Sequence, residues 1–333
     1  MHNIVDFSRP PTEKERLKFA ARLDRLSRPE TAIHIEKMHS SMPGVLPLDS
    51  LILRSGFSYR EKGLDTEASD RKAPPHSFRP TATRLITSRG AALRFALTTI
   101  AVVQSNRKPG AKAHLHELGL DIVGSSGRLG WTDLIATAAT DTNLTGVFLM
   151  ARDKRARSVR SAILALARAG IASIPGGPGD RDRFEKFALL NEVGSEIIGE
   201  AEEYRVPRKY ESTFAVPTGF VSNGWLHLLE DSEIALLLMV ACRKGGWDES
   251  GLLAIPAEVR LRNYGIHRDA YSSARKTLEW FGLLNVEEVG RHEDGRAENA
   301  ELRVNRLALL RDGFGEPATS TMIGALSAQL ARS

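Results

Sequence analysis

The sequence predicts an α+β protein, mainly α, that is built from two similar units. Apolar residues recur at helical spacing in several long stretches, and short aliphatic strands follow some of them. The corner "LARAGIASI" at 166–174 returns as "LEWFGLLNV" at 278–286, with matching leucine, glycine and aliphatic positions 112 residues apart. A length of 333 residues also suits two domains of roughly 150 residues each.

Residues 1–80 are predicted to form an N-terminal helical extension followed by a flexible linker. Thr12 can cap a short helix that carries Leu17 and Leu26 on one side. A helix of this kind usually docks on the rest of its own protein or on a second copy. Residues 60–80 are polar and contain three prolines, which is typical of an exposed loop.

The first unit covers residues 84–193 and is predicted to contain three helices and a hairpin. Its first helix lies between Ser88 and Pro109, where proline and glycine end the apolar pattern. The other predicted elements are helices over 130–140 and 151–170, a strand over 171–174, a turn over 175–180 and a returning strand over 183–190.

The second unit covers residues 214–312, after a charged connection over 194–213 and before a C-terminal tail over 313–333. Gly282 ends its third helix, because glycine takes the left-handed conformation without a Cβ penalty. The predicted elements are helices over 232–246, 256–265 and 268–282, and hairpin strands over 283–289 and 301–309.

The order of helix, short helix, basic helix and hairpin resembles the winged helix-turn-helix family of DNA-binding domains. The stretch "RNYGIHRDAYSSARKTLEWFGLLNV" carries this resemblance in residues 220–310, and 88–191 resembles the family less closely. The resemblance implies two tandem winged-helix domains. It also implies that the third helix of a unit enters the major groove, while the hairpin, or wing, contacts the DNA backbone or minor groove.

Arginine suits this role, because its planar guanidinium matches phosphate geometry and duplex DNA carries dense phosphate charge. The stretch "RDKRARSVR" at 152–160 begins the third helix of the first unit, although a merely solvated basic face would look the same. Base contacts are expected chiefly from 268–276 and also from 155–160. The candidate DNA-binding residues are Arg152, Lys154, Arg155, Arg157, Arg160, Arg181, Arg183, Arg260, Arg262, Arg268, Ser272, Ser273, Arg275, Lys276, Arg291 and Arg296.

Catalysis is not expected. The chain has no P-loop, no HExxH zinc signature and no Gly-x-Ser-x-Gly nucleophile elbow, so we predict no catalytic residue, no metal and no cofactor. His114 and His116 resemble the paired histidines of the HUH nicking enzymes, but no strands are predicted around them. The single cysteine, Cys242, lies in an apolar run and is interpreted as a small buried hydrophobe.

The sequence therefore predicts a protein that binds specific duplex DNA sequences, first of all a transcriptional regulator. A plasmid-type replication initiator that binds repeated origin sites is the alternative, and a protein-interaction scaffold without DNA is the third. The net charge of +5 permits a polyanionic partner. We expect a cytoplasmic, nucleoid-associated protein without secretory signal or membrane contact, and a homodimer is compatible with the pattern.

Overall fold

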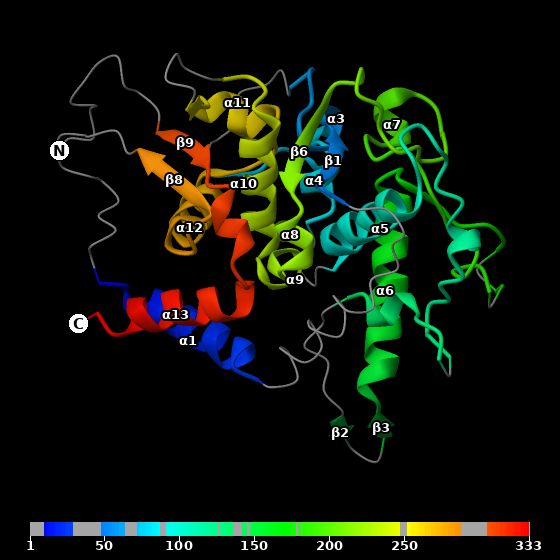
Figure 1. Ribbon diagram of the computed structural model, residues 1–333, viewed down its shortest axis with the longest axis horizontal. Coiled ribbons are helices and arrows are strands. Elements are labelled where there is room, and N and C mark those ends of the chain that lie inside the picture. Colours follow the sequence, from blue (N-terminus) through cyan, green and yellow to red (C-terminus); the bar gives the residue numbers. More distant parts are fainter. Residues whose placement is uncertain are drawn as a thin grey trace.

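The computed structural model has an α+β fold that is mainly helical, with small antiparallel sheets (Figure 1). This confirms the predicted fold class, though not its division into two winged-helix domains. The structure describes residues 10–28, 48–63, 72–86, 91–125, 127–135, 142–144, 147–177, 179–180, 182–246, 252–287 and 305–332.

Helices of very different length alternate with short strands along the chain. The α-helices are α1 (Glu13–Leu26), α3 (Ser55–Ser58), α4 (Thr81–Arg84), α5 (Ala92–Asn106), α6 (Ala151–Arg168), α7 (Ser195–Ile198), α8 (Gly219–Ser222), α9 (Trp225–Leu228), α10 (Asp231–Cys242), α11 (Ala257–Arg262), α12 (Arg268–Trp280) and α13 (Ala318–Leu330). Short 3-10 helices occur at η1 (His76–Phe78), η2 (Leu115–Leu118), η3 (Trp131–Asp133) and η4 (Asp312–Gly315).

The strands pair only in antiparallel fashion, β1 with β6, β2 with β3, β4 with β5, and β9 with both β7 and β8. Their bounds are β1 (Ser50–Arg54), β2 (Thr142–Leu144), β3 (Val147–Leu149), β4 (Ala172–Ser173), β5 (Ala188–Leu189), β6 (Thr213–Pro217), β7 (Leu253–Ala254), β8 (Leu284–Glu287) and β9 (Arg306–Leu309).

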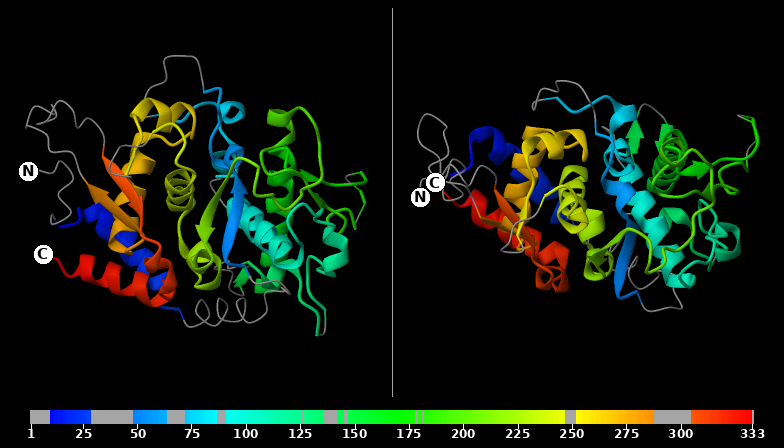
Figure 2. Two further views of the ribbon diagram at one scale, coloured as in Figure 1. Left: turned by 45° about the horizontal axis from the view of Figure 1, so that its top comes forward. Right: turned by 90° about the horizontal axis from the view of Figure 1, so that it is seen from above.

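The pair of β1 and β6 lies between the two halves of the molecule (Figures 1 and 2). Its register places Ile52 opposite Ala215, and the side chains of Leu51 and Leu53 are fully buried. These residues therefore belong to the core, and not to the peripheral extension expected for 1–80. Burial alternates along "SLILR", as it does in a strand with one face on the core.

Both halves repeat one order of elements: a strand, short helices, an apolar core helix, a long basic helix and a hairpin. The core helix packs on the long helix in each half, α5 on α6 and α10 on α12. The short helices cross between the halves, because α3 packs against α10 and α9 packs against α5. Such reciprocal contacts, together with antiparallel pairing of the two first strands, are typical of a local two-fold relation.

The repeated corner has the same backbone geometry in both halves. Gly170 and Gly282 have φ values of 73° and 70°, in the left-handed region. The N–H of Ile171 donates to the carbonyl of Leu166, as the N–H of Leu283 does to that of Leu278, at 3.0 Å in each case. The predicted corner is thus confirmed twice as a glycine-ended helix.

Helix α1 docks on the second half of its own chain, which is one of the two alternatives that its amphipathic pattern left open. Thr12 forms a capping box with Glu15 at its start. Two Arg22 nitrogens donate to the two oxygens of Glu233, both at 2.7 Å, and the Thr277 hydroxyl donates to Glu233 at 2.6 Å. All three side chains are buried, so the polar contact joins α1, α10 and α12.

Three further segments differ from their prediction. The residues expected as a C-terminal tail form η4 and then α13, which lies beside α1 (Figures 1 and 2). The predicted strand over 183–190 is shorter, since a turn precedes β5. In the predicted helix over 130–140 the structure shows only η3, and residues 136–140 lie outside the described residues.

Replacing Arg22 by alanine should destabilise the protein by about 3–5 kcal/mol, because it leaves the Glu233 carboxylate buried and uncompensated. Urea unfolding measures this change. The matched control is Lys18→Ala, whose ion pair with Glu230 at 3.1 Å is exposed and worth at most about 1 kcal/mol. Equal losses in the two variants would contradict the structural role of the buried pair.

The same pair should make stability depend on acid pH. Burial alone raises the pKa of Glu233, but Arg22 and the hydrogen bonds outweigh it and hold that pKa below its ordinary value of 4.5. A carboxyl whose pKa is lowered by folding stabilises the folded state fully at pH values above its pKa in the unfolded chain. The difference in unfolding free energy between wild type and Arg22→Ala should therefore shrink as the pH falls below 4.5.

Cys242 should react with a thiol reagent only when the protein opens. Burial raises the pKa of its thiol to about 11, so little thiolate exists at neutral pH. Ellman's reagent should modify the native protein slowly and the urea-unfolded protein at once. A native rate equal to the unfolded rate would refute the burial.

Candidate nucleic-acid interface

Helix α6 presents one outer face of exposed arginines, and its other face packs into the core. Val159, Ile163 and Leu166 are buried at spacings of three and four. The exposed face carries Arg157, Arg160, Ser161, Leu164 and Arg168, which we call the α6 stripe; of these only Leu164 is half-buried. Helical periodicity therefore separates the apolar face from the basic one.

The charge of the α6 stripe is not neutralised by close ion pairs. Among the described residues, no carboxylate lies within ion-pair distance of Arg157, Arg160 or Arg168. Arg160 does act electrostatically on Glu185. Burial raises the pKa of the Glu185 carboxyl, and the positive charge of Arg160 offsets part of that rise. The stripe therefore offers three guanidinium groups to an anionic partner.

The other predicted residues of this helix lie beside the stripe. Arg152 is exposed at the first turn and donates to the carbonyl of Gly124. Lys154 and Arg155 are half-buried. The segment between β4 and β5 contributes Arg183, whose guanidinium lies 4.7 Å from the centre of the Phe184 ring.

Arg181 of the first hairpin, and Arg291 and Arg296 of the second, lie outside the described residues.

The corresponding face of α12 is partly covered by α1. Lys276 forms an ion pair with Glu15 at 3.0 Å, and the Trp280 ring packs edge-on against Phe19 at 5.4 Å between ring centres. The first turns of α12 stay accessible: Arg268 and Ser273 are exposed, and Ser272 is half-buried. Helices α6 and α12 lie on opposite sides of the central strand pair (Figures 1 and 2).

Two predicted DNA-binding arginines are buried, and for them the prediction needs correction. Arg260 and Arg275 are 5% and 2% exposed, so neither side chain reaches a base edge in this structure. Both lie over the Tyr271 ring, at 4.8 and 5.8 Å from its centre. The signal in the sequence was the spacing of four between Tyr271 and Arg275, which puts them on one face. Arg262 is half-buried and pairs with Glu258 at 2.7 Å.

The histidine pair lacks the setting of a nicking enzyme. His114 has a positive φ of 42° and precedes η2, so the pair does not lie on a strand. His114 Nδ1 lies 3.2 Å from a Glu203 oxygen. Within the described part of the chain, no group of three potential metal ligands comes together.

One exposed basic turn was missed, because the charged stretch over 194–213 was interpreted only as a connection. It carries Arg205, Arg208 and Lys209, all exposed, beside Tyr210. The signal was present in the letters "RVPRKY", where cations flank an aromatic residue after a proline.

The comparisons with known proteins give no family. No protein-family model, curated protein or solved structure matches the chain. None of the helices in the described residues has both the length and the apolar character needed to span a bilayer.

Arg275 and Arg157 should respond differently to truncation. Arg275→Ala should lower the free energy of unfolding by about 1–3 kcal/mol, since it removes a buried side chain that packs on Tyr271. Arg157→Ala removes an exposed side chain and should change stability by no more than about 0.5 kcal/mol. Urea unfolding measures both changes. A larger loss of unfolding free energy in Arg157→Ala than in Arg275→Ala would contradict this assignment.

Proposed function

We propose that this protein binds specific sequences of duplex DNA and that the α6 stripe is its main contact surface. The observation that carries the proposal is the set of three exposed arginines on one helix face, none of which forms an ion pair among the described residues. Guanidinium groups bind phosphates and guanine edges in bidentate geometry, so such a face suits the major groove.

The dimensions of the stripe support this contact. Arg157 and Arg168 are 11 positions apart, which is about 16 Å along a helix axis. Between them, Ser161 is short enough for the helix to approach the floor of a groove about 12 Å wide, and the half-buried Leu164 offers an apolar contact to a thymine methyl group. Arginines at both ends would contact phosphates while Arg160 and Ser161 face base edges.

Under this proposal the second half supplies fewer contacts to DNA than the first half. Residues 268–276 were expected to supply most base contacts, but α1 covers Lys276 and core packing buries Arg275. Arg268, Ser272 and Ser273 remain as polar contacts at the start of α12. The first unit, more basic in sequence, thus becomes the main DNA-contacting unit.

We propose a transcriptional regulator as the biological role, with a plasmid-type replication initiator as the alternative. The positions of bound sites decide between them: promoters support the regulator, and tandem repeats at an origin support the initiator. A chain that binds no genomic fragment even at low salt would instead fit the protein-interaction scaffold.

The test is a gel-shift titration with random genomic fragments, followed by fluorescence anisotropy on the enriched duplex. The double variant Arg157→Ala with Arg168→Ala, which removes the arginines at both ends of the stripe, should weaken binding and reduce the slope of log K against log salt by about 2, since each lost phosphate contact removes about 0.9. Its control is Arg311→Ala, an exposed arginine outside the stripe. A slope that both variants leave unchanged would refute the assignment to α6.

A further inference from the structure

The turn at 205–211 combines exposed cations with one strongly exposed aromatic ring. Tyr210 is 78% exposed, the highest exposure among the large hydrophobic side chains described. Arg208 Nη1 donates to its hydroxyl at 2.9 Å, and the Arg208 guanidinium carbon lies 5.9 Å from the ring centre. The ring is therefore oriented by a neighbouring cation while most of its surface faces solvent.

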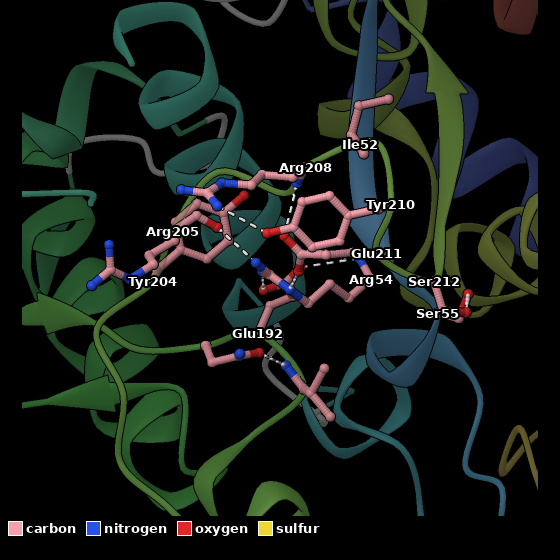
Figure 3. Close-up of polar contacts among 12 residues, drawn as sticks. Ile52, Arg54, Ser55, Glu192, Tyr204, Arg205, Arg208, Tyr210, Glu211 and Ser212 are labelled. Carbon is pink, nitrogen blue, oxygen red and sulfur yellow. Dashed lines mark hydrogen bonds and ion pairs between the residues drawn. The ribbon is translucent and has the colours of Figure 1, made fainter. Parts of the chain in front are cut away.

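A chain of hydrogen bonds and ion pairs ties this turn to the core (Figure 3). The backbone N–H of Arg208 donates to Glu211 at 2.8 Å, and Glu211 accepts from Arg54 Nε at 2.5 Å. Arg54 also pairs with the fully buried Glu192 at 2.7 Å. Partial burial raises the pKa of Glu211, but the hydrogen bonds from Arg208 and Arg54 outweigh it and hold that pKa below its ordinary value.

A second segment adds charge beside the turn. The Gly110 N–H donates to the Val206 carbonyl at 2.7 Å, and the Val206 N–H donates to the Ala111 carbonyl at 3.0 Å. The same pairing places Lys112 opposite Arg205 in an antiparallel bridge, and it brings the turn that contains Lys108 and Gly110 beside Arg208. Gly110 has a φ of 86°, and a Cβ there would collide with the Arg208 guanidinium, which lies directly over the glycine.

The surplus charge of this surface is positive. Lys112 is partly neutralised by Glu203 at 3.5 Å, and Glu211 is engaged by Arg54. Among the described residues, no carboxylate forms an ion pair with Lys108, Arg205 or Lys209. We call these three cations, Arg208 and Tyr210 the Tyr210 surface.

We propose that the Tyr210 surface binds an unpaired nucleic-acid strand, with the ring of Tyr210 stacked on a base and the cations on the flanking phosphates. A duplex hides the faces of its bases within the stack, so an isolated protruding ring gains stacking only from an unpaired base. Base stacking on aromatic rings combined with backbone-tracking cations is the general mode of single-strand binding. This site is separate from the α6 stripe and does not depend on duplex binding by α6.

The test uses the full chain and a fluorescein-labelled oligothymidylate of about 20 nucleotides, with anisotropy at low salt as the measurement. Tyr210→Ala should weaken binding by about 5- to 150-fold, the equivalent of one lost stack. Tyr210→Phe keeps the ring and should remain within about threefold of wild type. Affinity for duplex DNA should be unchanged in both variants.

The matched control is Phe78→Ala, which removes another exposed ring that lies near an arginine, Arg60. It should leave oligothymidylate binding unchanged. The proposal is overturned if wild type fails to bind the oligonucleotide, if Tyr210→Ala binds as wild type does, or if that variant loses duplex and single-strand affinity equally. If the α6 stripe variant loses affinity for duplex DNA but keeps its affinity for oligothymidylate, the two sites are separate, as proposed.

Discussion

The antiparallel pairing of β1 with β6 is the contact on which the arrangement of both halves depends. It joins the first strand of one half to the first strand of the other. Gln104 of α5 also holds β1, since its side-chain amide accepts from the N–H of Ile52 at 3.0 Å and donates to the Ile52 carbonyl at 2.6 Å. Since each first strand leads into short helices that pack on the other half, neither half has its complete core alone. Arg54 extends this contact outward, where its pairs with Glu192 and Glu211 fix the basic turn.

Arginine has two roles in this protein, and burial separates them. Arg22 and Arg54 each form hydrogen-bonded ion pairs with a fully buried carboxylate, an arrangement that offsets desolvation only when the geometry is good. Arg260 and Arg275 pack on an aromatic ring inside the second half. A count of basic residues therefore overestimates the surface available to an anionic partner.

The two long basic helices differ in what covers them. Helix α1 lies over the second part of α12, with Phe19 against Trp280 and Glu15 against Lys276. The outer face of α6 carries arginines without such ion pairs among the described residues. Helices α6 and α12 thus hold the same place in the order of elements, but the second part of α12 is covered by α1 while the outer face of α6 is exposed.

The sequence by itself determined the local features: the capping box at Thr12, the start of α12 at Arg268, the glycine corners and the basic outer face of α6. These follow from helical periodicity and from the backbone freedom of glycine, which act within a few residues. Only the tertiary structure decided the pairing of β1 with β6, the burial of Arg275 and the exposure of Tyr210. Those outcomes depend on segments far apart in sequence, because burial and strand pairing are set by whichever distant surface packs against them, and no local pattern specifies that partner.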